Sequence, residues 1–193
     1  MLFLLQSMPI PIIALIIIIL IVFVVLMFIF YFNRFVVLGN RIDNSLSQID
    51  VQLKKRADLV PNLLASVKGY MKHEQKIMSE VTKARQVLLK APTIERKIKA
   101  GNELQTALRS IFAIAENYPN LKANENFLNL QQELSAIEDK IAYSRQFYND
   151  SILSYNNSVE SFPGNVFANM YGKKEKQFLE IPKEAKAVPK VEF

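Results

Sequence analysis

The sequence predicts an all-α protein: an N-terminal transmembrane helix, followed by a long antiparallel three-helix bundle with a short fourth helix and coiled-coil-like packing. Three observations support this class. The first 33 residues carry no charged side chain, apolar residues then recur at steps of three, four or seven, and only 5 of the 193 residues are glycine. Such periodicity indicates amphipathic helices, and scarce glycine argues against tight β-hairpins. We expect an anchor at 1–33, a helical domain at 34–172 and a flexible charged tail at 173–193.

The anchor is an uninterrupted run of 21 hydrophobic residues that begins at Ile12 and ends at Phe32. At ~1.5 Å of rise per residue, this helix spans ~31 Å, the thickness of the hydrocarbon core of a bilayer. The alternative is a cleaved signal peptide. No basic residue precedes the run, however, the run is too long, and Tyr31-Phe32-Asn33 is a poor cleavage site. The sequence therefore predicts an uncleaved single span with the lipid bilayer as its partner.

Charge predicts the orientation of the span and the packing of the helices. Arg34 and Arg41 follow the apolar run, so the positive-inside rule places the N-terminus outside and the helical domain in the cytoplasm. Residues 34–100 hold 14 basic and 6 acidic side chains, and residues 101–172 hold 4 and 8. Helices of opposite charge favour antiparallel packing. The basic cluster Lys54-Lys55-Arg56 has a second interpretation, contact with anionic lipid by a helix that leans onto the membrane.

The first helix of the bundle is expected to run from Arg34 to about Lys90. One apolar seam with a seven-residue repeat follows it from Ile42 to Leu88, with two charged positions, Arg56 and Glu74. Pro61 is expected to kink this helix. Whether this helix is continuous with the anchor stays open at this stage. A second helix is expected from an N-cap at Thr93 to about Glu116.

The third helix has the clearest pattern, because six of its aromatic and aliphatic residues are each seven apart: Phe127, Leu134, Ile141, Tyr148, Tyr155 and Phe162. Pro163-Gly164 is expected to end it, and residues 166–171 to add one or two helical turns. Asn149 and Asn156 lie in mid-helix, where a buried amide fixes the register of packed helices. The other interpretation of these amides is a polar recognition surface.

Composition leaves little catalytic or metal-binding chemistry. The chain has no cysteine and one histidine, His73, which we expect to be solvated, and it contains no nucleotide-binding or metalloprotease motif. A metal site built only of carboxylates near Glu133, Glu138 and Asp139 is the alternative to a solvated helix face. The basic pI of about 9.4 comes without the interleaved aromatic residues of nucleic-acid-binding surfaces. We therefore expect no enzyme activity, no cofactor, no metal and no nucleic acid.

Several motifs, in order from about residue 31 to the C-terminus, resemble those of the LemA family. They are Arg41-Ile42-Asp43-Asn44, residues 48–56, Asp58-Leu59-Val60-Pro61-Asn62-Leu63, Val67-Lys68-Gly69-Tyr70, Glu116-Asn117-Tyr118-Pro119, Leu121-Lys122-Ala123-Asn124, Arg145-Gln146-Phe147-Tyr148-Asn149-Asp150, Tyr155-Asn156, Phe162-Pro163 and Pro189-Lys190-Val191-Glu192-Phe193. One departure is Ser45-Leu46, where many family members have Ala-Trp. It removes aromatic surface near the membrane end of the domain.

The resemblance implies a single-pass protein of the bacterial cell (inner) membrane with a long antiparallel helical bundle and no known enzyme activity. Relatives of the family include a protein of the magnetosome membrane. The motifs supply our candidate interaction or structural residues: Arg56, Asp58, Pro61, Asn62, Tyr70, Glu116, Asn117, Tyr118, Pro119, Asn124, Asn126, Phe127, Arg145, Tyr148 and Asn149.

Together these observations predict a non-enzymatic scaffold at the membrane that binds a protein partner or self-assembles. The alternative is a membrane-organising or lipid-binding protein that uses the basic first helix. An enzyme is a third class, which the short inventory of acid–base and nucleophilic groups disfavours.

Overall fold

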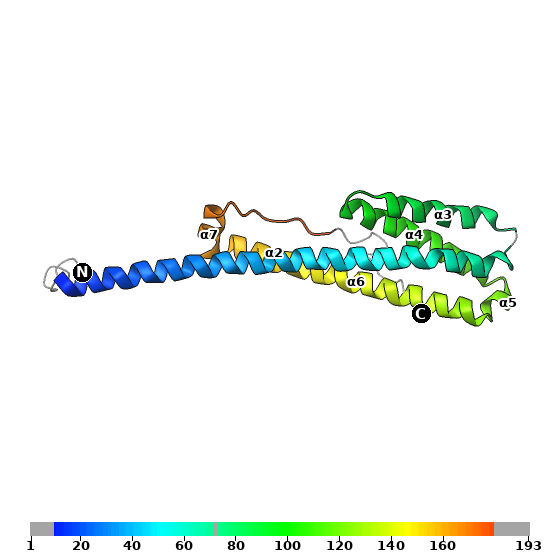
Figure 1. Ribbon diagram of the computed structural model, residues 1–193, viewed down its shortest axis with the longest axis horizontal. Coiled ribbons are helices and arrows are strands. Elements are labelled where there is room, and N and C mark those ends of the chain that lie inside the picture. Colours follow the sequence, from blue (N-terminus) through cyan, green and yellow to red (C-terminus); the bar gives the residue numbers. More distant parts are fainter. Residues whose placement is uncertain (1–9, 72, 180–193) are drawn as a thin grey trace, which may run out of the picture. The chain divides into compact units, whose positions relative to one another are not determined.

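The computed structural model describes residues 10–71 and 73–179, and their regular secondary structure is entirely helical. Six helices follow one another in these residues: α2 (Ile10–Lys68), α3 (Gln75–Lys90), α4 (Ile94–Ala115), α5 (Pro119–Lys122), α6 (Glu125–Glu160) and α7 (Gly164–Met170) (Figure 1). The predicted all-α class is confirmed. The described residues form two compact units, one of residues 10–42 and 150–179 and one of residues 43–149. Helices α2 and α6 each contribute to both units.

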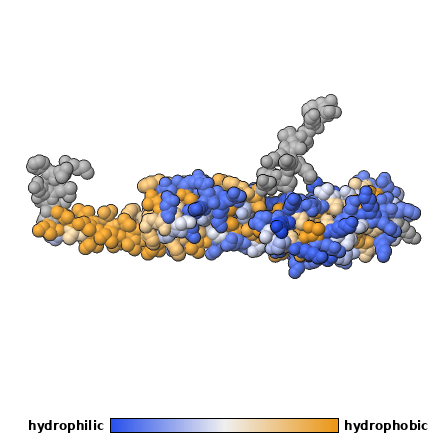
Figure 2. All heavy atoms as spheres, turned by 90° about the horizontal axis from the view of Figure 1, so that it is seen from above, coloured by the Kyte–Doolittle hydropathy of each residue, from blue (hydrophilic) through white to orange (hydrophobic). Residues whose placement is uncertain are grey.

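Helix α2 contains the predicted anchor and continues from it without a break. Its apolar run carries no charged side chain, and the most apolar stretch of it is not buried. Figure 2 shows this part of α2 as an almost wholly apolar surface. The helix is therefore long and apolar enough to cross a membrane. Pro61 lies inside it on an exposed position, and α2 continues beyond this proline to Lys68.

The predicted first helix of the bundle is corrected in one respect, because the chain turns back between α2 and α3. The backbone N–H groups of Tyr70 and Met71 both donate to the carbonyl of Val67, at 3.0 and 2.9 Å. Met71 is fully buried beneath this turn. Val67 before it and Val81 after it are also fully buried, so both helices present apolar residues to one core, although Tyr70 at the turn is 41% exposed.

The unit of residues 43–149 consequently contains four long helical segments, from α2, α3, α4 and α6, where three were predicted. Two contacts for each pair of helices give their directions. Along α2, Asp50 pairs with Lys97 of α4, and Arg56 then bonds Gly101, further along α4. Arg56 also pairs with Glu138 of α6, whereas Tyr70, just beyond the end of α2, bonds Asn124, just before the start of α6. Helix α2 is therefore antiparallel to α6 and parallel to α4. Helix α4 begins as predicted, with Thr93 Oγ1 accepting from the N–H of Arg96 at 3.4 Å. Fully buried aliphatic residues from these segments form the core: Ile49, Leu53, Val60, Leu63, Val81, Leu104 and Ile111.

The predicted heptad stripe of α6 is buried from Phe127 to Tyr155, but its last member is not. Helix α6 ends at Glu160, and Phe162 is 83% exposed just beyond that end. The seven-residue repeat predicts burial only as long as the helix continues, so the repeat fails at this position.

In the unit of residues 10–42 and 150–179, α7 packs on α2 through aromatic rings. Phe167 stacks on Tyr31 with ring centroids 4.9 Å apart, and Tyr171 meets Phe28 edge-on at 4.9 Å. Residues 173–179 then follow α6 as an extended segment. Asn156 is buried, as predicted, but its amide bonds the backbone N–H and carbonyl of Lys176, each at 2.9 Å, rather than another helix. The rest of the predicted tail lies outside the described residues.

Candidate functional site

The unusual chemistry of residues 43–149 is a buried cation, Arg56 of α2. The residue is 2% exposed, and its Nη1 donates to the carbonyl of Gly101 on α4 at 3.1 Å. Its guanidinium also pairs with the carboxylate of Glu138 on α6. A Cβ at Gly101 would overlap the side chain of Leu53, so any larger residue at this contact requires Leu53 to move. Arg56 therefore ties three helices together.

Further arginines surround this cation. Arg145 of α6 donates through Nη2 to Oδ1 of Asn102 at 2.6 Å, while its buried Nε has no hydrogen-bond partner among the described residues. Burial, and then the positive charges of Arg145 and Arg109, lower the pKa of Arg56 to about 10. Burial also lowers the pKa of Arg145. Both groups stay protonated at neutral pH, so the cluster supplies fixed charge and directional hydrogen bonds rather than proton transfer.

The predicted polar motifs at the other end of this unit serve as caps and turns. Asn124 Oδ1 accepts from the N–H of Phe127 at 3.1 Å and so caps the start of α6. Its Nδ2 donates to the hydroxyl of Tyr70 at 3.5 Å. Pro119 is the first residue of α5 and follows Tyr118. At this position no hydrogen bond within the helix is lost through the missing N–H of proline. These contacts give Asn124, Tyr70 and Pro119 structural roles at this end of the unit.

The remaining candidates do not gather into one site. Tyr148 is buried, and its pKa is raised first by burial and then by the carboxylates of Glu95 and Asp43. Asn149 is half-buried beside it on α6. The other six are exposed on α2, on α6 and in the turn after α4: Asp58, Pro61, Asn62, Asn126 and the pair Glu116-Asn117. The structure thus brings Arg56 and Arg145 together but leaves most of the motif residues apart.

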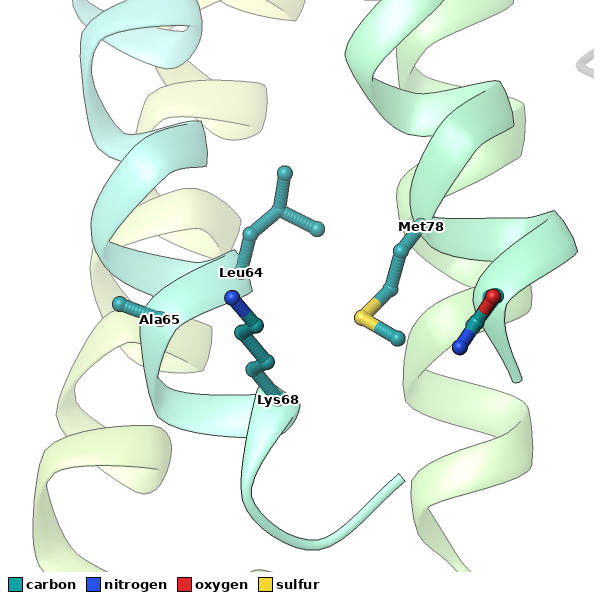
Figure 3. Close-up of a pocket in the computed structure, with 5 residues that line it drawn as sticks. Leu64, Ala65, Lys68 and Met78 are labelled. Atoms are coloured by element: carbon teal, nitrogen blue, oxygen red, sulfur yellow. The ribbon is translucent and has the colours of Figure 1, made fainter. Parts of the chain in front are cut away.

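Sequence reasoning missed a pocket of about 580 Å³ between the end of α2 and the start of α3. Leu64, Ala65 and Met78 give it an apolar lining, with Lys68 and Gln75 completing it (Figure 3). The side chains of Leu64 and Lys68 from α2 face Met78 of α3 across it. The pocket exists only because the chain turns between α2 and α3, and the sequence pattern predicted one continuous helix there. The apolar Leu64, directly after the seam residue Leu63, was the only local signal.

Metal-binding and acid–base groups do not converge in the part of the chain that is described. Over residues 10–71 and 73–179, no group of three histidine, aspartate or glutamate side chains is placed to hold a metal ion. Glu138, considered above as a carboxylate ligand, pairs with Arg56 instead. His73 is exposed.

Comparison with known proteins agrees with the motifs. The chain is 29% identical to Protein LemA of Metamycoplasma hominis over 133 residues, which cover 67% of this chain and 59% of that protein. It is 22% identical to Magnetosome protein MamQ of Magnetospirillum gryphiswaldense over 174 residues, covering 77% of this chain and 64% of that protein. Magnetosome protein MamQ 1 of Paramagnetospirillum magneticum matches equally well. The chain thus spans less than two thirds of these relatives. The family model described as "LemA family" matches residues 45–193. The chain therefore belongs to the LemA family.

Proposed function

We propose that this LemA-family protein is a non-enzymatic, single-pass membrane protein whose helical bundle is a scaffold for protein–protein interaction or self-assembly. The apolar part of α2 supports the membrane assignment, since its exposed surface has the length and composition of a span. Arg34 and Arg41 beyond the span favour a cytoplasmic bundle by the positive-inside rule. Two relatives carry the name of magnetosome proteins, and none of the relatives above carries the name of an enzyme.

The observation that carries the scaffold proposal is the open pocket between α2 and α3. Its apolar lining of Leu64, Ala65 and Met78 suits the apolar face of a partner helix, a common mode of protein recognition. Lys68 adds one positive charge to the lining, which favours a partner with an acidic side chain beside that face. Two polar candidates elsewhere in this unit are occupied by contacts within the bundle: Arg56 bonds Gly101, and Asn124 caps α6.

Site-specific photo-crosslinking in living cells tests this proposal. A photoreactive amino acid at Met78 is expected to capture one discrete protein species, and the same group at Gln131, an exposed position of α6, is expected to capture none. Two differently tagged copies of the chain then distinguish self-assembly from a foreign partner. Equal capture at both positions, or no protein adduct at Met78, contradicts the scaffold proposal.

The alternative, lipid binding through the basic first helix, is weakened by the burial of Arg56. The cluster Lys54-Lys55-Arg56 was its main support, but Arg56 faces Glu138 and Gly101 inside the bundle. Lys54 and Lys55 alone remain exposed in this cluster. Two lysines attract anionic lipid by only about 2 kcal/mol even at the membrane surface, at ~1 kcal/mol each.

A further inference from the structure

Helix α7 has one face against the predicted span. Phe167 and Tyr171, one helical turn apart, contact Tyr31, Phe28 and Phe32, with centroid distances of 4.9 to 5.6 Å for three of these ring pairs. The hydroxyl of Tyr171 donates to the backbone carbonyl of Phe28 at 2.7 Å. Gly164 and Ala168 are buried on the same side, and a Cβ at Gly164 would meet Tyr31 and the carbonyl of Ser158.

These contacts fix the depth of α7 relative to the apolar run. The run ends at Phe32, and Phe28 lies one turn earlier, which is ~6 Å along the helix axis. If residues 12–32 fill the hydrocarbon core, the rings of Phe167 and Tyr171 lie at the boundary between acyl chains and headgroups. Tyrosine is enriched at that level because its ring is apolar and its hydroxyl finds a polar partner.

The other face of this segment is apolar and exposed. Val166 and Met170, one turn apart on α7, are 49% and 64% exposed, and Phe162 just before the helix is 83% exposed. Burial of a large apolar side chain is favourable by about 1.5–3 kcal/mol, and this free energy is not gained while the side chain stays in water. The segment from Ser161 to Gly172 contains no charged residue. Glu160 precedes it, and Lys173-Lys174-Glu175-Lys176, with a net charge of +2, follows it. A short apolar face followed by a net positive run is typical of an element that lies in the membrane interface.

We propose that residues 162–171 form a second membrane contact, with α7 lying in the headgroup–acyl boundary beside the end of the span and Phe162, Val166 and Met170 inserted among the lipids. This inference rests on the proposed membrane anchoring of α2. Lipid is the occupant because Phe167 and Tyr171 attach this exposed apolar segment to Phe28 and Phe32 of the span, which are themselves 39% and 49% exposed. The extended segment after α7 is held by Asn156, which keeps its lysines near the same boundary.

Tryptophan fluorescence of the full-length protein in lipid vesicles tests this contact, because the natural sequence has no tryptophan. Three single-tryptophan variants are compared: Phe162→Trp on the proposed contact, Phe30→Trp in the span, and Tyr143→Trp on α6, which is 71% exposed. The vesicles contain phosphatidylcholine and phosphatidylglycerol, some of it brominated near the headgroup end of the acyl chains. Iodide serves as the aqueous quencher.

We expect brominated lipid to quench Phe162→Trp and Phe30→Trp, and iodide to quench Phe162→Trp several-fold less than Tyr143→Trp. Bromine near the headgroup is expected to act more strongly on Phe162→Trp than bromine deep in the chains, since interfacial elements sit ~5–10 Å into the boundary. Quenching of Phe30→Trp without quenching of Phe162→Trp overturns the α7 contact and leaves the anchor intact. Failure of Phe30→Trp overturns the anchor itself. Shielding of Phe162→Trp from both quenchers means that protein covers this face, which also overturns the lipid contact.

A second pair of variants separates insertion from a local loss of structure. Phe162→Leu keeps an apolar side chain, whereas Phe162→Asp introduces a charge at the same exposed position. A polarity-sensitive dye attached through Val166→Cys is expected to report an apolar environment in vesicles when it is combined with Phe162→Leu. Combined with Phe162→Asp, the same dye is expected to report a more aqueous environment, with an emission intensity several-fold lower. An identical dye signal in both backgrounds contradicts the proposal.

Discussion

Replacement of Glu138 by glutamine is the sharpest test of the buried arginine centre. The change removes the negative charge that faces Arg56 and keeps the size of the side chain. Loss of one partner from a fully buried ion pair costs about 3–5 kcal/mol, because the other charge stays buried without compensation. The side chain of Arg56 is 2% exposed, but that of Glu138 is 33% exposed. Water screens the carboxylate, so we expect Glu138→Gln to lower the free energy of unfolding by about 2–3 kcal/mol.

The measurement is thermal unfolding of the full-length protein in a mild detergent, followed by far-UV circular dichroism. At about 4 °C per kcal/mol for a domain of this size, the expected drop in Tm is about 8–12 °C. Asp50→Asn is the matched control, since Asp50 also pairs with a cation on a neighbouring helix, Lys97 at 2.7 Å, but the two side chains are 43% and 31% exposed. Loss of that pair is expected to lower the free energy of unfolding by about 0.5 kcal/mol and Tm by about 2 °C.

A second variant tests the physical reason for the loss. Arg56→Met combined with Glu138→Gln removes the stranded charge, so the double variant should be more stable than Glu138→Gln alone. If Glu138→Gln costs no more than Asp50→Asn, Arg56 does not depend on Glu138 for compensation. If Arg56→Met fails to restore stability, the cost comes from packing rather than from a buried unpaired charge.

Three further predictions concern individual contacts. Gly101→Val should lower stability by about 2–3 kcal/mol in the same unfolding assay, because the added carbons overlap Leu53, and Leu53→Ala should recover part of that loss. Thr93→Ala should cost about 0.5–1 kcal/mol by removing the N-cap of α4, whereas Thr93→Ser should be nearly neutral. Asn156→Ala should speed amide hydrogen exchange of residues 173–179, measured by mass spectrometry, while exchange in α4 stays the same. Unchanged exchange of residues 173–179 would show that Asn156 does not hold them.

Periodicity predicted which residues are buried better than how the chain connects them. Ile49, Val60, Val81 and Leu88 lie on the one predicted seam and all face the core. Both helices present apolar residues of this repeat to the same interior, and the repeat departs from burial only at the turn, where Met71 is buried and Tyr70 is exposed. A hairpin and a continuous helix therefore have the same apolar pattern, and Gly69-Tyr70 was too weak a local signal to separate them.

The candidate site shows the same division between local and long-range information. Arg56 was recognisable from the sequence as a charge on an apolar seam. Its partners were not recognisable, because Glu138 lies on another helix and Gly101 contributes only a carbonyl. Phe162 fits the heptad of α6 in sequence yet is exposed, since the helix ends two residues earlier. Contacts made across long sequence separations were thus the part that pattern alone could not supply.

The buried ion pair also explains how a repetitive core reaches one register. A slip of α6 by one heptad would replace Leu134 by Ile141 or Ile141 by Tyr148 in the core, changes that an apolar stripe tolerates. The same slip would place either Gln131 or Arg145 where Glu138 now faces Arg56. The first leaves the buried cation without a counter-charge, and the second sets two cations against each other. Hydrophobic repeats hold these helices together, and the pairing of Arg56 with Glu138 disfavours both of these shifted alignments.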